Sequence, residues 1–132
     1  MSSSTASRPE RALTPFAKIL KQAVESSPNA VGGAFAASDG EMVDSYATID
    51  PHEWAVLTAH YGIVLAHLSS CFGTWHYGGP EYFIAQHAKL DILVHAVDAG
   101  YFALIAIQKP SNIGLALTRL RAACSSLKKE MS

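Results

Sequence analysis

The sequence predicts a single domain of the α/β (α+β) class, in which a five-stranded antiparallel sheet is sandwiched by helices. Two extended runs separated by Asp39-Gly40 give a strong signal for a β-hairpin. Three other segments carry the apolar spacing of helices, and three short runs in the C-terminal half are typical of strands. The resulting order is α-β-β-α-β-β-β-α, and a chain of 132 residues is long enough to bury one core.

Composition and charge exclude several classes of protein. Hydrophobic residues make up 49% of the chain and charged residues 16%, which excludes a disordered body and suggests extra surface buried by association. The formal net charge of −1 gives no electrostatic reason to expect nucleic acid as a partner. Residues 1–12 are Ser-rich, so we expect a flexible polar tail there and one domain over residues 13–132. The N-terminus lacks the apolar segment of a secretory signal, and the expected location is cytoplasmic.

The first helix is expected to follow Thr14, which can cap it, with Pro15 in its first turn. Its apolar face has helical spacing and consists of Phe16, Ile19, Leu20, Ala23 and Val24. Residues 30–37, AVGGAFAA, form the first strand of the hairpin and residues 42–48 the second. The first strand has such small side chains that it is intrinsically weak, so we expect a helix to pack closely on it.

A long central helix is expected over residues 52–72, with Asp50 as its N-cap and Pro51 in its first turn. No Lys, Arg, Asp or Glu occurs between Glu53 and Glu81. A helix that is apolar nearly all round must be buried on more than one side. We expect its bulky face to cover the sheet; this face is Trp54, Leu57, Tyr61, Val64, Leu65, Leu68 and Phe72. A stripe of small side chains would let another helix approach closely; this stripe is Ala55, Ala59, Gly62, Ala66 and Ser69.

Two other interpretations of the central helix stay open at this point. It fits the core helix of a monomer, and its uncharged run is close to the ~20 residues that a bilayer requires. Against a membrane span stand His60, His67 and several hydroxyl side chains, and no Lys or Arg lies nearby to set an orientation. We therefore expect no membrane insertion.

The remaining elements are a turn-rich connection over residues 73–80, three strands and a final helix. Residues 81–87 have the mixed polarity of an edge or interface strand. Residues 89–97 and 101–108 are the two strongest strands, joined by the short loop Asp98-Ala99-Gly100. Asn112 is placed to cap the last helix, whose apolar line is Ile113, Leu117, Leu120, Cys124, Leu127 and Met131.

Motifs that carry catalysis are missing from the sequence. It contains no GxxxxGK[ST], GxGxxG, HExxH or GxSxG pattern, and Gly32-Gly33 alone is a poor match to a phosphate loop. His60 and His67 are two helical turns apart, which is too far for the usual i, i+4 pair of metal ligands. Cys71 has no orienting acid nearby in the sequence. We therefore predict no catalytic residues, no cofactor and no metal site.

The distribution of charge is uneven along the chain. No Lys or Arg occurs between Lys21 and Lys89. An acidic middle consists of Asp39, Glu41, Asp44, Asp50 and Glu53. A basic end consists of Lys109, Arg119, Arg121, Lys128 and Lys129. These are either two solvated faces of opposite sign or a docking surface steered by charge.

Two long strings resemble a known family. Residues 16–43, FAKILKQAVESSPNAVGGAFAASDGEMV, look like the opening helix, the Gly-containing first strand and the Asp-Gly hairpin of the Roadblock/dynein light chain family. Residues 93–131 look like its closing hairpin and last helix, which Asn112 and Gly114 open. Together with the order of elements, which corresponds to a Roadblock/profilin-like fold, they place the chain nearest to the bacterial MglB-type members. The stretch 69–80 is richer in Gly and aromatic residues than the family pattern.

The resemblance implies a homodimer that regulates a small Ras-like GTPase, by activating hydrolysis or by effector-type binding, and implies no active site of its own. In the family, the central helices of two copies pack antiparallel and the third strands meet. Carried onto this sequence, the dimer interface would include Ala55, Ala59, Gly62, Ala66, Glu81, Phe83 and Ala85. The surface for the GTPase would include His52, Glu53, Val56, His60, Ile63 and His67. The alternative function is a non-catalytic dimeric scaffold for a multiprotein or motor-associated complex.

Overall fold

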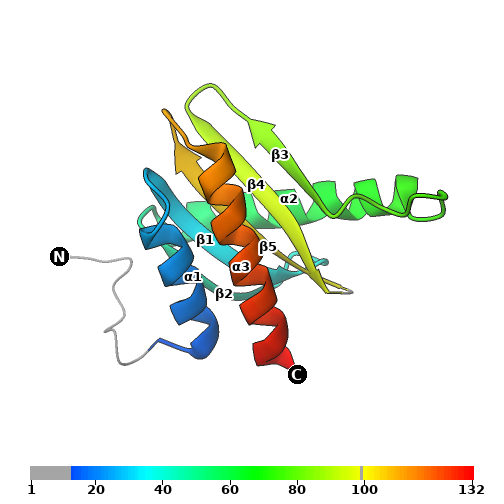
Figure 1. Ribbon diagram of the computed structural model, residues 1–132, viewed down its shortest axis with the longest axis horizontal. Coiled ribbons are helices and arrows are strands. Elements are labelled where there is room, and N and C mark those ends of the chain that lie inside the picture. The colour runs from blue at the N-terminus through cyan, green and yellow to red at the C-terminus, as the bar shows by residue number, and fades with distance from the viewer. Residues whose placement is uncertain (1–12, 99) are drawn as a thin grey trace.

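The computed structural model describes residues 13–98 and 100–132 (Figure 1). Along the chain the elements are α1 (Pro15–Glu25), β1 (Ala30–Ala37), β2 (Met42–Ala47), α2 (Pro51–Phe72), β3 (Tyr82–Gln86), β4 (Leu90–Asp98), β5 (Tyr101–Gln108) and α3 (Ile113–Met131). This is the predicted order α-β-β-α-β-β-β-α. The expected tail over residues 1–12, and Ala99 in the expected β4–β5 loop, lie outside the described residues.

The five strands form one antiparallel sheet, as predicted, and their order across the sheet is β2-β1-β5-β4-β3. β5 is central and pairs with both β1 and β4, with Gly33 and Leu93 opposite Ile105 on its two sides. Within the described part of the chain, β2 and β3 are the edge strands. The β3–β4 turn begins one residue before the predicted end of β3, since the His87 N–H donates to the Leu90 carbonyl at 2.8 Å.

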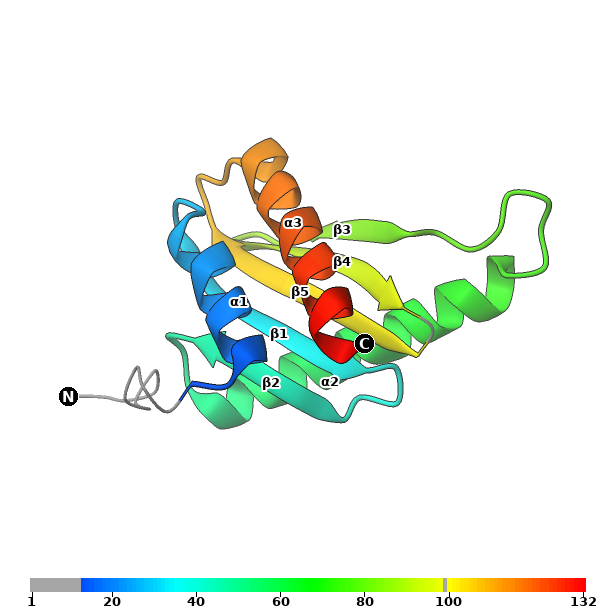
Figure 2. The ribbon, with the colours of Figure 1, turned by 60° about the horizontal axis from the view of Figure 1, so that its bottom comes forward.

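Helices cover both faces of the sheet, but unequally. α1 and α3 lie side by side over one face, and α2 crosses the other face alone (Figures 1 and 2). The core under α1 and α3 contains Leu20, Phe35, Leu93, Ile105, Leu120 and Leu127, all buried. The core under α2 contains Trp54, Leu65, Ile92, Val94, Phe102 and Leu104, also buried.

The predicted helix caps are confirmed by their hydrogen bonds. Thr14 accepts from the Ala17 N–H through its hydroxyl at 3.1 Å, and Asp50 accepts from the Glu53 N–H through its carboxylate at 2.9 Å. Asn112 accepts from the Leu115 N–H at 3.0 Å at the start of α3. Each bond satisfies one of the backbone donors that a helix leaves unpaired at its first turn.

The small side chains of β1 are explained by close packing on both faces, as the sequence led us to expect. A Cβ atom on Gly32 would lie 2.8 Å from Cη2 of Trp54 on α2. On the opposite face, a Cβ atom on Gly33 would lie 3.2 Å from Cγ2 of Val24 on α1. β1 therefore lacks bulk because helices occupy that space on both sides of the sheet.

Candidate interaction surface

The inner side of α2 is set by the side chains that the sheet needs. Trp54 is only 1% exposed and lies over β1, while Leu65 is buried about two helical turns past Thr58. Thr58 is also buried, and its hydroxyl donates to the Trp54 carbonyl at 2.9 Å, so this polar group is satisfied within the helix. The predicted bulky face is therefore inward over most of its length; the exception is Val64, which is 42% exposed.

The predicted stripe of small residues does not form one outward surface. Gly62 is buried, and a Cβ atom there would lie 3.1 Å from the Phe102 ring of β5. Placing Gly62 at a contact with a second helix was therefore wrong, because the glycine lets α2 approach its own sheet. Half-buried Ala59 lies against Gly40 of the β1–β2 turn. Ala55 and Ala66 of the same stripe are exposed.

The outward side of α2 is apolar and uncharged. Val56 is 42% exposed and Ile63 is 53% exposed, values typical of surface charges rather than of branched aliphatic residues. At 100° per residue, His52 and His67 lie on the same outward side, and both are exposed. Four of the six predicted partner-binding residues thus lie on the side of α2 that faces away from the sheet, here called its outward pole: His52, Val56, Ile63 and His67.

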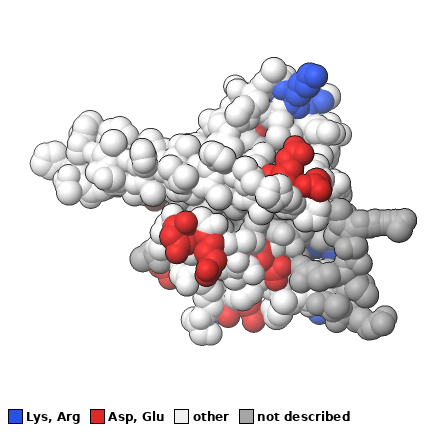
Figure 3. Space-filling view, turned by 180° about the vertical axis from the view of Figure 1, so that it is seen from behind, with Lys and Arg blue, Asp and Glu red and all other residues white. Residues whose placement is uncertain are grey.

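Charge surrounds this surface but does not enter it. Figure 3 shows the α2 side of the molecule, where Asp and Glu lie around a broad area without charged side chains. The uncharged stretch runs from Trp54 to Pro80 along the chain. Nothing in the described part of the chain brings three potential metal ligands together. The arrangement fits desolvation against another apolar surface better than the binding of an ion.

A groove of about 470 Å³ follows one flank of α2, on the side nearer to β3. Glu53, Val56 and His60 line it, and all three were predicted to bind a partner. The groove also involves four residues that the sequence did not assign to a site: Leu57, Tyr61, Val64 and His87. His87 comes from the β3–β4 turn, and nothing in the sequence indicated that it would approach α2.

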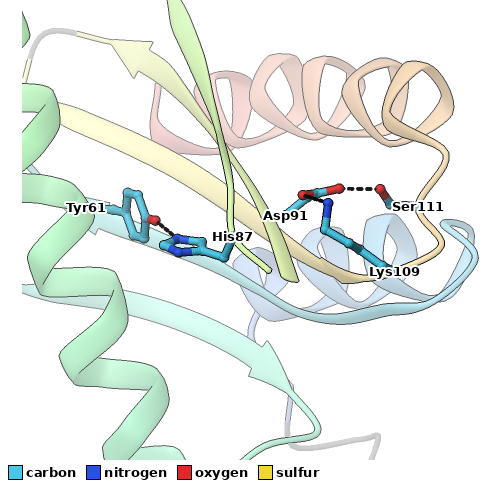
Figure 4. A network of polar contacts seen from close by, with 5 residues as sticks. All are labelled: Tyr61, His87, Asp91, Lys109 and Ser111. Atoms are coloured by element: carbon cyan, nitrogen blue, oxygen red, sulfur yellow. Dashed lines mark hydrogen bonds and ion pairs between the residues drawn. The ribbon is translucent and has the colours of Figure 1, made fainter. Parts of the chain in front are cut away.

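Tyr61 and His87, which both line the groove, contact each other (Figure 4). The Tyr61 hydroxyl is hydrogen-bonded to Nε2 of His87, and the two rings meet edge to face with centroids 6.1 Å apart. Partial burial raises the pKa of the Tyr61 phenol, which therefore remains protonated and can donate this bond. The contact fixes the β3–β4 turn against the flank of α2.

The last part of α2 extends beyond the sheet. The 22 residues of α2 span about 33 Å, whereas five strands span about 19 Å between the outermost strand axes. Figures 1 and 2 show residues 66–81, here called the arm, projecting from the body. Trp75 near its tip is 58% exposed and Tyr77 is 90% exposed. Phe72 packs edge to face on Trp75, with ring centroids 5.0 Å apart.

β3 presents the other half of the predicted dimer interface. Glu81 is exposed, whereas Phe83 and Ala85 are partly buried against the core under α2. Ile84 points to the opposite face of the sheet and is 37% exposed. β3 pairs only with β4 within the described residues, so its outer edge carries free backbone donors and acceptors that a further strand can use.

A second polar group of residues lies at the start of β4 and is structural (Figure 4). The Asp91 carboxylate is buried, accepts a hydrogen bond from the Ser111 hydroxyl and lies 2.9 Å from Nζ of Lys109. The Ser111 hydrogen bond, followed by Lys109, lowers the pKa of Asp91. Ser111 directly precedes the N-cap of α3, so this group ties β4 to the connection that starts α3.

By length and composition, α2 would also suffice to cross a membrane, and only 17% of its most apolar window is buried. However, Trp54 and Leu65 of α2 are part of the core under the helix. Moving α2 into a bilayer would expose that face of the sheet. The apolar outward surface is therefore better explained by a protein partner than by a span.

Comparison with known proteins gives the fold a name. No protein-family model matches the sequence, and no protein of curated function matches it. Myxococcus xanthus MglB aligns over 91% of this chain and 97% of its own, with a TM-score of 0.80 and 13% identity. A Roadblock/LC7 domain from Streptomyces avermitilis aligns over 86% and 95%, with a TM-score of 0.78 and 11% identity. MglC from Myxococcus xanthus aligns over 89% and 99%, with a TM-score of 0.66 and 20% identity. The fold of this chain is therefore the Roadblock/LC7 fold, as the two resembling strings predicted.

Proposed function

We propose that this chain forms a homodimer that binds a small Ras-like GTPase through the outward pole of α2 and modulates its cycle. The observation that carries the proposal is the apolar, uncharged surface at Val56 and Ile63, which the other described residues leave uncovered. The fold supports it, because the resemblance noted in the sequence implies a GTPase regulator of the MglB type. One MglB structure has a tetrameric arrangement, which agrees with a fold that associates. The proposed location is the cytoplasm.

The dimer we propose joins the β3 edges and packs α2 against α2. The flank of α2 that faces β3 carries Leu57, His60 and Val64, since the groove beside His87 lies there. Ala59 lies on the opposite flank, beside the β1–β2 turn. The seam between the two α2 helices is therefore assigned to the flank at Val64. By helical spacing, the exposed Ala55 and Ala66 share the flank of Ala59 and lie outside this seam.

This assignment leaves the outward pole of α2 free for the GTPase. The chain has no nucleotide-binding motif, so the chemistry of hydrolysis would remain in the partner. Docking would act by favouring one arrangement of the switch regions of the GTPase over others. A surface of branched aliphatic side chains flanked by His52 and His67 suits such an apolar contact with a polar rim.

The test is single-turnover GTP hydrolysis by a small Ras-like GTPase from the same organism, with and without this protein. We expect acceleration by the unmodified chain and a loss of tenfold or more in that effect for Ile63→Asp. Ser125→Asp, on the exposed side of α3, is the matched control and should accelerate hydrolysis like the unmodified chain. If the protein neither changes the rate nor binds the GTPase, the proposal is wrong.

A dimeric scaffold is the second candidate, and the same apolar surface favours it. The two functions differ in their dependence on nucleotide. A regulator should bind the GTP-loaded partner at least several-fold more tightly than the GDP-loaded one, because its effect requires a preference between conformations. Equal binding of both forms without a change in rate would establish the scaffold instead.

A further inference from the structure

The aromatic tip of the arm is not explained by the fold or by the proposed contact with a GTPase. Leu68 and Phe72 are only partly buried and lie outside both cores, because the sheet has already ended beneath them. Trp75 and Tyr77 add a large aromatic surface at the end of the arm. Such exposed aromatic residues are typical of the anchors that carry most of the energy of a protein interface.

The groove on the same molecule is chemically complementary to this tip. The surface that lines it is almost wholly apolar, although Glu53 is among the lining residues. The arm carries no Asp or Glu before Glu81 at its return to β3, so no like charge would be buried by their contact. The groove volume of about 470 Å³ is ample for one indole side chain together with its neighbours.

We propose that Trp75, at the tip of the arm, docks into the groove of a second copy, lined there by Leu57, Tyr61 and Val64. This inference rests on the proposed homodimer and adds the residues that lock it. When two antiparallel α2 helices cross near Leu68, on the same flank as Val64, Trp75 of one copy lies at the level of Tyr61 of the other. By two-fold symmetry, the tip of each copy then occupies the groove of the other, so the assembly is complete with two copies.

Other occupants fit the groove less well. Residues 1–12, MSSSTASRPERA, contain no aromatic residue and no Leu, Ile or Val, so this segment offers nothing to fill an apolar groove. A lipid surface would cover Trp75 and Tyr77 but would leave the groove empty. No Lys or Arg lies between Lys21 and Lys89 to attract anionic headgroups to the arm. A second copy accounts for both the tip and the groove.

Fluorescence can report directly on this contact, because the chain has 2 tryptophans and one is buried. Nε1 of Trp54 has no hydrogen-bond partner among the described residues, so Trp54→Phe removes no hydrogen bond. In that background Trp75 is the sole indole. We expect its emission to shift to shorter wavelength as protein concentration rises through the dimer dissociation constant, in step with the mass from light scattering.

Matched substitutions separate this contact from general surface effects. Val64 in the groove and Val43 on β2 are both 42% exposed. Val64→Lys should weaken the dimer tenfold or more and abolish the shift in Trp75 emission, while Val43→Lys should leave both unchanged. Trp75→Ala in the unmodified chain should weaken the dimer to a similar extent.

A covalent test does not depend on the Trp54→Phe background. Copies carrying Val64→Cys and copies carrying Trp75→Cys, both with Cys71→Ser, are mixed and oxidised. Cys124 is buried and does not compete. A disulfide between the two different copies is expected, because the bond requires Cα atoms within about 7 Å. Its absence from a mixture that dimerises would overturn the inference.

The outcomes also distinguish this inference from the proposed homodimer. A chain that is monomeric at every concentration refutes both. A stable dimer in which Trp75 keeps the emission of a water-exposed indole refutes only the docked arm. A shift that requires phosphatidylcholine vesicles would assign the tip to a lipid surface, and one that requires the GTP-loaded GTPase would assign it to that partner; either result overturns docking on a second copy.

Discussion

The two faces of the sheet solve the same packing problem in different ways. On one face, α1 and α3 together cover a core that includes Phe35, Ile105 and Leu120. On the other face, α2 alone covers a core of similar make-up around Trp54 and Phe102. α1 is apolar on one side and polar on the other, whereas α2 is apolar on almost every side. One face is completed by the chain itself, and the other still carries apolar surface after folding.

This difference teaches how a fold of this size keeps a surface for association. A helix with an apolar outward side loses nothing in its own core, because its inner side chains are already buried. The outward side chains, by contrast, gain about 25 cal/mol for each Å² that a partner removes from water. The two buried cores thus set the stability of the domain, and the outward side of α2 sets what the domain binds.

The largest expected effect comes from a comparison of two side-chain truncations, one on each face. Leu120→Ala in α3 removes a side chain that is 1% exposed, and we expect it to lower the free energy of unfolding by about 2–5 kcal/mol. Ile63→Ala on α2 should lower it by no more than about 0.5 kcal/mol in the monomer. Urea denaturation of dilute protein measures both. Equal losses would mean that Ile63 is part of the domain core and would break the comparison.

Glycines on the two faces of β1 give the next largest effect. Gly32→Ala places a Cβ atom 2.8 Å from the buried ring of Trp54, which has no room to move away, and we expect a loss of about 1–3 kcal/mol. Gly33→Ala meets a methyl group of Val24 at 3.2 Å, and a small shift of that side chain relieves the contact. Thermal unfolding of both variants should therefore place Gly32→Ala clearly below Gly33→Ala. The reverse order would show that the α2 face is the more adaptable one.

Much of the fold could be predicted from the sequence because its signals are local. Thr14, Asp50 and Asn112 each precede a helix that their side chains cap, so a short window around each residue sufficed. The Asp39-Gly40 turn and the short apolar run over Tyr101–Gln108 were equally local signals, of a hairpin and of a buried strand. The five-stranded antiparallel sheet then followed from the order of the elements.

The details of the α2 surface could not be predicted, because they depend on contacts between distant segments. Helical periodicity placed Gly62 and Ala66 on one stripe, yet Phe102 from β5 approaches the first and nothing described approaches the second. His87 lies 26 residues beyond Tyr61 and meets it only because β3 folds back along α2. Periodicity identifies which residues share a face but does not tell which neighbour that face meets.

An acid titration tests how much the contacts of Asp91 with Ser111 and Lys109 stabilise the α1/α3 face. The Ser111 hydroxyl and Lys109 hold the pKa of Asp91 below its ordinary value, so the ionised carboxylate stabilises the folded chain above pH ~4. That stability should be lost as pH falls from about 4 through the lower pKa of the folded state. Asp91→Asn should therefore be less stable than the unmodified chain at pH 7, with the difference shrinking toward pH 3. Glu130→Gln, on the exposed side of α3, is the control and should show no such convergence.

The smallest expected effect concerns the reactivity of the two cysteine thiols, Cys124 on α3 and Cys71 on the arm. Cys124 of α3 is buried, and burial raises the pKa of its thiol to about 12, so it should not react with a thiol reagent at pH 8 in the folded protein. Cys71 is exposed on the arm and should react within minutes. One thiol per chain should titrate in buffer and two in urea. Raising the protein concentration into the dimer range should slow the reaction of Cys71 if the arm is covered by a second copy, while Cys124 stays silent. Fast labelling of Cys124 in buffer would instead show that the α1/α3 face opens readily. The proposed difference between a closed α1/α3 face and an open α2 face would then be wrong.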